Sequence, residues 1–252
     1  MLDVLHITDV HLLPDAGARL VNVDTQRCLE AVLDQALADG RPDALVATGD
    51  IAQEGRADVY ARFLDTVRSR YDGPLLCTPG NHDLLAPMRD AGLPMQDLEF
   101  DHWRIVALDS HADESLASVV PAEKLAELSA RVGDRRTLLV THHHLLPVQC
   151  PWLDGDRIAG ADVHAWLAAS TAVRAVVFGH VHQIVEARLG NVRLMGSPST
   201  CFQFLPRSAR FTLDTLPPGF RRIRLYDDGS IVSAVIRGRP FSDPPAIQSD
   251  HT

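Results

Sequence analysis

The sequence predicts an α/β domain in which a parallel sheet is built first and antiparallel strands are added later. Two observations predict this fold class. Short apolar runs alternate with amphipathic helical stretches through residue 178, and the later apolar runs are separated by tight Gly-Asn and Asp-Asp-Gly turns. Alternation of strands and helices favours a parallel sheet covered on both faces, whereas short runs with tight turns favour antiparallel pairs.

The first half is expected to form three strands separated by two helices. Each helix shows apolar residues at helical spacing, and the first one begins at a capping Asp24-Thr25 pair and is stopped by Gly40. The expected strands are 4–8, 44–48 and 75–78, and the expected helices are 25–39 and 57–70.

The second half continues with a hairpin over 99–108, in which Asp101-His102 forms the turn. A helix over 122–132 follows Pro121, and a proline is well suited to a helix start. The next expected elements are strand 137–141, helix 161–169 and strand 173–178. Four antiparallel strands are then expected to form the second layer of a mixed sandwich: 184–189, 192–195, 222–226 and 231–235.

Length and charge limit the classes of function. The chain has 252 residues, 46% of them hydrophobic, and a net charge of -9, so it can bury a sizeable core. We expect one domain over 1–238 and a poorly ordered, proline-rich tail over 239–252. The acidic balance argues against nucleic acid as a partner. The first residues enter a strand at once, so we expect a cytoplasmic protein without a signal peptide or membrane contact.

Polar side chains follow the apolar strands repeatedly, at the point where each strand ends. Ligands of open α/β sheets gather at this carboxyl edge. Carboxylate, imidazole and amide groups without thiolates suit ions such as Mn, Fe, Zn or Co, and their number exceeds the shell of one ion with open positions. We therefore expect two metal ions. The strand-end groups are Asp9, His11, Asp50, Asn81, His82, His142, His180 and His182.

These groups resemble, in order and spacing, the signature of the calcineurin-like metallophosphoesterase superfamily. The matching motifs are Asp9-x-His11, Gly49-Asp50, Gly80-Asn81-His82-Asp83, His142 and Gly179-His180-x-His182. Longer runs at 141–152, 196–204 and 211–215 resemble the bacterial class III cyclic-AMP phosphodiesterases. The resemblance covers about residues 2–236 and implies a four-layer α-β-β-α sandwich of two mixed sheets flanked by helices.

The resemblance also implies a role for each motif residue. It divides the ligands between two metals that share one carboxylate: Asp9, His11 and His182 for the first, Asn81, His142 and His180 for the second, and Asp50 for both. In the run His142-His143-His144 we expect the first histidine to be the ligand, with His143 as the alternative. Catalysis is expected to depend on Asp50 and on His82, which contacts the phosphate or protonates the leaving oxygen.

The implied activity is hydrolysis of a small cyclic nucleotide, 3′,5′-cyclic AMP, to 5′-AMP. A hydroxide held between the two metals, with Fe or Mn favoured over Zn or Co, would attack phosphorus in line. The alternatives keep the site and change the substrate, to 2′,3′-cyclic nucleotides, glycerophosphodiesters or phosphomonoesters. A non-catalytic scaffold is a further alternative, but such a protein would be expected to lose ligands. The chain is expected to act as a monomer or homodimer.

Other residues receive supporting expectations. Asp83 is expected to brace the metal-site loop, and Trp152 either stacks on a base or is packed. His6 is expected to lie in the core or at the surface, without a metal. Arg221 is expected to be a surface charge. The expected substrate contacts are Asn81, His82, His143, Thr200 and Cys201.

Overall fold

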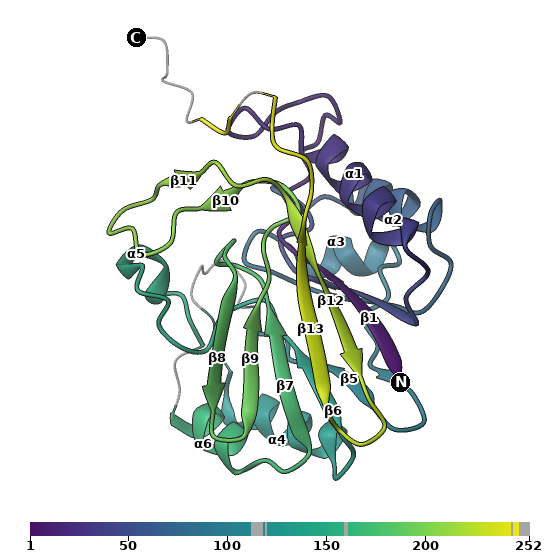
Figure 1. Cartoon of the computed structure of the whole chain (residues 1–252), viewed down its shortest axis with the longest axis vertical. Helices are drawn as coiled ribbons and strands as arrows, with labels where there is room; N and C mark the ends of the chain where they lie inside the picture. The colour runs from purple at the N-terminus through teal and green to yellow at the C-terminus, as the bar shows by residue number, and fades with distance from the viewer. Residues whose placement is uncertain (112–117, 119, 159–160, 243, 247–252) are drawn as a thin grey trace.

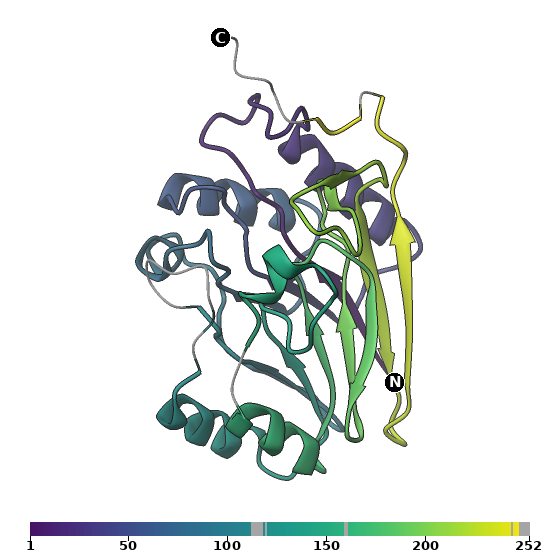
Figure 2. The same ribbon diagram turned by 90° about the vertical axis from the view of Figure 1, so that its left-hand side faces the viewer.

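The strands of the protein form two large mixed sheets that pack face to face, as the computed structural model shows (Figures 1 and 2). The structure describes all residues except 112–117, 119, 159–160, 243 and 247–252. The first sheet contains β1 (Leu2–Ile7), β2 (Ala44–Thr48), β3 (Leu75–Thr78), β12 (Gly219–Leu225) and β13 (Ile231–Arg237). Its order is β13-β12-β1-β2-β3, with β1, β2 and β3 parallel and the other pairs antiparallel.

The second sheet is built in the same way from later parts of the chain. Its strands are β4 (Leu98–Glu99), β5 (Arg104–Ala107), β6 (Thr137–Val140), β7 (Val173–Phe178), β8 (Val185–Leu189) and β9 (Val192–Gly196). Their order is β4-β5-β6-β7-β9-β8, and β5, β6, β7 and β9 are parallel. A separate short hairpin pairs β10 (Gln203–Phe204) with β11 (Leu213–Asp214).

The predicted four-layer α-β-β-α sandwich is confirmed, but the predicted membership of its second layer is wrong. The late antiparallel strands do not form a layer of their own, because β8 and β9 extend the second sheet whereas β12 and β13 extend the first. The early parallel strands are likewise divided between the two sheets. Each sheet therefore has a parallel centre and antiparallel additions at its edges.

Helices cover the outer face of each sheet. The helices α1 (Thr25–Ala38) and α2 (Ala57–Arg68) pack on the first sheet, and α4 (Ala122–Val132) and α6 (Ala161–Ala169) pack on the second. The two pairs lie at opposite ends of both views (Figures 1 and 2). The short helices α3 (Leu85–Asp90) and α5 (Pro151–Asp154) were not predicted, because so few residues show no helical period. None of the helices in the described residues is long and apolar enough to span a bilayer.

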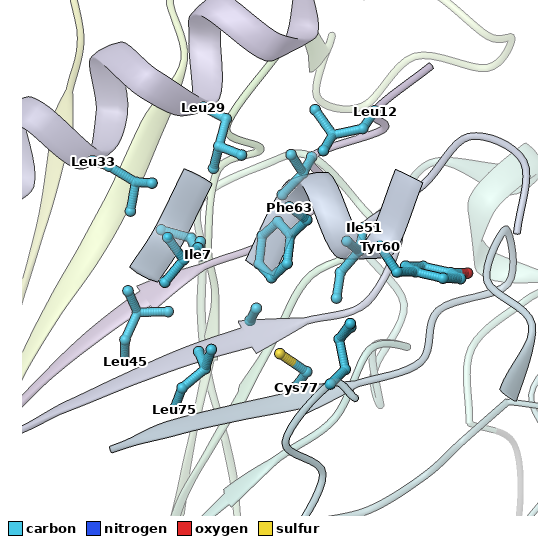
Figure 3. Close-up of a cluster of buried hydrophobic side chains, with 14 of the residues drawn as sticks. Ile7, Leu12, Leu29, Leu33, Leu45, Ile51, Tyr60, Phe63, Leu75 and Cys77 are labelled. Carbon is cyan, nitrogen blue, oxygen red and sulfur yellow. The ribbon is translucent and has the colours of Figure 1, made fainter. Parts of the chain in front are cut away.

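Neighbouring residues of the central strands serve different core layers. Val4 faces the layer between the sheets, whereas Leu5 faces α1 and α2, and both are fully buried. The same alternation separates Val46 from Leu45 on β2, as the period of two in a strand requires. Figure 3 shows the layer beneath the helices, where Phe63 packs among aliphatic side chains. Continuous apolar runs were needed because both faces of these strands are buried.

The C-terminal tail was predicted to be poorly ordered, and residues 243 and 247–252 lie outside the described part of the chain. In the described part, Phe241 packs against the core of the second sheet and Ala246 N donates to Val21 O at 3.0 Å. The tail runs beside the loop that precedes α1.

His6 and Arg221 form part of a polar network between the sheets. His6 is completely buried, with Nδ1 2.6 Å from Ser197 Oγ and Nε2 2.7 Å from Thr48 Oγ1. Arg221, predicted as a surface charge, is 1% exposed and donates from Nε to the same Ser197 hydroxyl. The prediction that Arg221 is a surface charge was therefore wrong, because the hydrogen bonds of this network hold its guanidinium between the two sheets. Of the two positions expected for His6, core or surface, the structure shows the core.

The buried imidazole of His6 should make the protein less stable in acid. Burial and the neighbouring Arg221 lower the pKa of His6 from 6.5 to about 3, so between these values the unfolded chain binds a proton that the folded chain does not. The stabilisation is complete above pH 6.5 and is lost as the pH falls toward 3. In metal-free protein, the difference in free energy of unfolding between wild type and His6→Gln should shrink by about 2 kcal/mol from pH 7 to pH 5. Urea unfolding at each pH measures this difference, and a constant difference would contradict the assignment.

Candidate metal centre

The predicted ligands meet where the carboxyl ends of the two parallel centres share an edge. Asp9 and His11 follow β1, Asp50 follows β2, and His180 and His182 follow β7. All five adopt the left-handed region, with φ of 53°, 51°, 48°, 65° and 47° in that order. Such a backbone is uncommon for residues other than glycine and is found where the surrounding structure enforces it, above all at functional sites.

Backbone hydrogen bonds hold these strand ends in place. Asp9 N donates to Gly49 O at 3.1 Å and His11 N donates to Asp50 O at 2.8 Å, which ties the end of β1 to the end of β2. His180 N donates to Asp9 Oδ1 at 2.9 Å and joins the two sheets. The ligand-bearing turns are therefore held together by hydrogen bonds of their own backbone N–H groups.

A first group consists of Asp9, His11 and His182, whose potential ligand atoms all lie within 4.8 Å of one another. His182 Nε2 lies 3.4 Å from Asp9 Oδ1 and 3.2 Å from His11 Nε2. These side chains are almost completely buried, with exposures of 0 to 4%. The aromatic rings of Phe202 and Phe204 stack on the two imidazoles from outside.

A second group forms around the side-chain oxygen of Asn81, which follows β3. Asn81 Oδ1 lies 3.0 Å from His142 Nε2 and 2.9 Å from His180 Nδ1. Asp50 lies between the groups, because its Oδ2 is 3.4 Å from His142 Nε2 and 3.6 Å from His11 Nε2. One carboxylate therefore faces ligands of both groups.

The electrostatics of the centre favour bound positive charge. Burial alone would raise the pKa of Asp9, but His182 outweighs it and lowers this pKa to about 2. Burial would likewise raise the pKa of Asp50, and His142 holds it well below its usual range. Burial would lower the pKa of His142, but Asp50 raises it to about 9. A proton on this imidazole offsets only part of the charge of the two buried carboxylates, and a divalent cation would offset it more completely.

Two further imidazoles are held neutral. Burial lowers the pKa of His11 to about 4, and burial together with His142 lowers that of His180 well below its usual value. Metal ions bind the neutral imidazole and the ionised carboxylate, so His11, His180 and the two carboxylates are in the required state at neutral pH, whereas His142 would have to release its proton to a bound ion. The residues present thus fit two first-row divalent ions, and the donor set excludes a thiolate-bound zinc.

A family model described as calcineurin-like phosphoesterase matches residues 2–184. The chain belongs to this family. This chain is 35% identical over 243 residues to a curated relative, a 3′,5′-cyclic adenosine monophosphate phosphodiesterase CpdA from Pseudomonas aeruginosa. The match covers 93% of this chain and 89% of the relative. The protein of the same name from Haemophilus influenzae is 35% identical, covering 99% and 95%.

Solved structures show the same fold at low sequence identity. A dimetal phosphatase from Danio rerio aligns with a TM-score of 0.64 and 17% identity, covering 94% of the phosphoesterase and 96% of that chain. A purple acid phosphatase from yellow lupin aligns with a TM-score of 0.68 and 13% identity, covering 95% and 52%. These structures show the fold, whereas the family match and the curated relatives identify this chain as a hydrolase that acts on phosphodiester bonds.

His82 lies at the partly exposed side of the centre, where one of its ring nitrogens is within 4.8 Å of potential ligand atoms of His11 and Asp50. Its backbone N–H donates to Asp50 Oδ1 at 3.0 Å, and its ring centroid lies 5.0 Å from that of His11. The side chain is only partly buried, with Nδ1 3.3 Å from Gln53 O.

The histidine run separates into three positions. His142 faces Asp50 and Asn81, as the two distances above show, which favours it over His143 as the ligand. His143 is fully buried and its Nδ1 lies 2.8 Å from Ser110 Oγ, although its ring also lies within ligand distance of His142 and His180. His144 is buried behind His180, on which its ring is stacked.

Two predicted substrate contacts lie beneath the centre. Thr200 and Cys201 are fully buried, and their side chains donate to the backbone carbonyls of Thr8 and Asp9 at 3.2 Å each. Burial also raises the pKa of the Cys201 thiol well above its usual value. This burial argues against direct substrate contact, and both residues instead support the turn that carries Asp9.

The predicted brace role of Asp83 is confirmed, and the neighbouring Gly80 is required for space rather than for its backbone conformation. The Asp83 carboxylate accepts from the N–H groups of Gly80, Ile51 and Ala52 at 2.9 to 3.2 Å and from Tyr60 Oη at 2.9 Å. Gly80 does not adopt a positive φ in this structure. It is required because a Cβ there would lie 2.2 Å from Asp50 Oδ1.

Several supporting residues were missed in the sequence. Gln53 Oε1 lies 2.8 Å from His11 Nδ1, and Phe202 and Phe204 cover the first group. A polar residue three positions after Asp50 was a weak signal for Gln53, whereas the aromatic pair resembled ordinary core residues. Trp152 packs edge-on against Phe204 and Phe211, with centroids 5.0 and 5.3 Å apart, which favours the packed alternative for this side chain.

Proposed function

We propose that the protein is a phosphodiesterase that uses two metal ions to hydrolyse 3′,5′-cyclic AMP to 5′-AMP. The observation that carries this proposal is the position of Asp50 between two ligand groups, each with further buried ligands of the right chemistry. The curated relatives at 35% identity are named as 3′,5′-cyclic AMP phosphodiesterases and are matched over nearly their whole length. Their names support the choice of substrate.

The donor set suits Fe or Mn, with Zn or Co as alternatives. When bound, such ions would supply Lewis acidity, which lowers the pKa of water and offsets charge on the phosphate oxygens. Asp9, His11 and His182 would hold one ion, Asn81, His142 and His180 the other, and Asp50 both. The predicted monomer or homodimer and the predicted cytoplasmic location stay predictions.

The protein's own side chains would orient the substrate and move the proton. In hydrolysis, water attacks phosphorus in line with the P–O bond to the ribose oxygen on the opposite side. That bond breaks, and the ribose oxygen that leaves needs a proton. His82 is partly exposed beside both Asp50 and Asn81, so we propose it as the group that contacts the phosphate or protonates the leaving oxygen. Buried aromatic rings behind the first ligand group keep water away from its imidazoles.

Removal of the metals should abolish turnover and lower stability together. Protein stripped with a chelator and freed of it is expected to lose essentially all hydrolysis of cyclic AMP and to regain it with Mn²⁺. The midpoint of thermal unfolding should rise as Mn²⁺ is restored, because an ion that binds only the folded state stabilises it by mass action. Turnover that persists in stripped protein would refute the metal-dependent mechanism.

A substrate panel tests the second half of the proposal. The metal-loaded enzyme is assayed on 3′,5′-cyclic AMP, a 2′,3′-cyclic nucleotide, a glycerophosphodiester and a phosphomonoester, with products resolved by chromatography. We expect the highest kcat/KM on 3′,5′-cyclic AMP, with 5′-AMP as the product. A higher value on another diester would replace the proposed substrate and leave the metal centre unchanged, because the pocket walls rather than the fold set the substrate.

A further inference from the structure

The four histidines of the centre differ in what their second ring nitrogen contacts. Three of them have an oxygen at 2.8 Å from this nitrogen: Gln53 Oε1 for His11, Thr48 O for His142 and Phe202 O for His182. Each oxygen accepts a hydrogen bond from Nδ1–H, so the lone pair of Nε2 is directed into the centre. Such partners fix the tautomer and the ring orientation of a metal-binding histidine.

His180 is the exception among these four. It turns Nδ1 toward Asn81, and its Nε2 is buried without a hydrogen-bond partner in the described structure. A buried N–H without an acceptor is costly. The carboxylate of Asp156 faces this nitrogen, with Oδ2 at 3.7 Å from Nε2. This separation exceeds the usual donor–acceptor distance of an N–H···O hydrogen bond by about 0.8 Å.

We propose that Asp156 is a positioning residue for the second metal, because its carboxylate accepts a hydrogen bond from His180 Nε2–H and so leaves the Nδ1 lone pair free for the ion. This inference rests on the two-metal centre proposed above. It gives the fourth histidine the same kind of partner that the other three already have. Asp156 acts through His180 and does not itself contact the metal or the substrate.

Backbone hydrogen bonds hold the loop that carries Asp156 next to the histidine run. Asp156 N donates to Leu153 O at 3.0 Å, and Ile158 N donates to His144 O at 2.8 Å. The ring of His144 is stacked on the ring of His180, with centroids 5.6 Å apart and an interplanar angle of 16°. The imidazole of His180 thus has Asn81 Oδ1 at Nδ1 and Asp156 Oδ2 facing Nε2. A small movement of the Asp156 carboxylate would close the hydrogen bond to Nε2.

The end of α5 supplies a matched control. Asp154, the last residue of this helix, lies two residues before Asp156 and also faces a histidine, with Oδ1 3.7 Å from Nε2 of His144. His144 is not one of the proposed ligands, and Asp154 Oδ1 accepts from Val148 N at 2.7 Å. An asparagine at position 154 can keep that bond through its own side-chain oxygen. Asp154→Asn and Asp156→Asn therefore remove the same charge from neighbouring positions of one segment.

The test is a calorimetric titration of metal-free protein with Mn²⁺, which reads metal affinity without any assay of turnover. Wild type is expected to show two binding steps, and Asn81→Ala identifies the step of the second metal by weakening it. Asp156→Asn should weaken that same step about 10- to 100-fold. It should leave the other step at its wild-type affinity. Asp154→Asn should leave both steps unchanged.

Three results would overturn the inference. Wild-type affinity at both steps in Asp156→Asn would show that His180 needs no carboxylate. Equal weakening of both steps, or of the second step in Asp154→Asn as well, would show a general effect of the loop. A wild type with a single step would refute the two-metal centre itself, whereas two steps without hydrolysis of cyclic AMP would refute only the proposed substrate.

Discussion

Replacement of Asp50 by asparagine is expected to lower kcat/KM for cyclic AMP by about 10³-fold, more than any other isosteric change in the protein. The carboxylate lies between both ligand groups, 3.4 Å from His142 Nε2 and 3.6 Å from His11 Nε2. An amide would keep the hydrogen bond from His82 N but would remove the charge that both ions share. A loss of about 4 kcal/mol of transition-state stabilisation corresponds to this factor.

Metal content and a second aspartate distinguish this effect from a general loss of structure. The variant should bind less Mn²⁺ at both steps of a titration, because Asp50 serves both groups. Asp109 offers the control, since it also follows a strand of the parallel centre but pairs with Lys124 at 3.3 Å. Asp109→Asn should change kcat/KM by less than about twofold. Full turnover and full metal content in Asp50→Asn would contradict a bridging role.

More of the candidate site than of the arrangement of the two sheets could be predicted from the sequence. Ligand types and their spacing after apolar runs are properties of single segments, so Asp9, Asp50 and Asn81 stood out directly. The division of strands between two sheets is a tertiary property. Val4 and Val46 read like any residue of a strand buried on both faces, and nothing local says that β12 pairs with β1 whereas β9 pairs with β7.

The supporting contacts of the site were beyond sequence reasoning for a related reason. His142 and His182 are oriented by backbone carbonyls, those of Thr48 and Phe202, and a carbonyl leaves no mark on the residue type. Thr200 and Cys201 were placed near the metal edge correctly, but their direction was not given by the sequence. Their side chains donate to the backbone of Thr8 and Asp9, at the end of β1 and its turn.

Replacement of Asp83 by alanine is expected to cost about 4 kcal/mol of folding free energy. The supporting role of this residue could be predicted from the sequence, because Asp83 directly follows Asn81 and His82. The fully enclosed carboxylate accepts four hydrogen bonds, three of them from N–H groups of the turns that carry Asp50 and Asn81. Alanine would leave these donors buried without acceptors. Each such donor costs about 1–3 kcal/mol, reduced where the turns relax or water enters.

Unfolding by urea measures this loss, and two further variants separate its causes. Tyr60→Phe removes the hydroxyl that donates to Asp83 and accepts from Leu84 N, so it should cost about 1–2 kcal/mol. Asp65→Ala, on the exposed face of α2, should change stability by less than about 0.5 kcal/mol. Because the Asp83 bonds fix both turns at once, Asp83→Ala should also weaken both Mn²⁺ binding steps. A variant that unfolds like wild type would mean that water or another acceptor can satisfy the turns, and the geometry of Asp50 and Asn81 would then depend on the metals rather than on the fold.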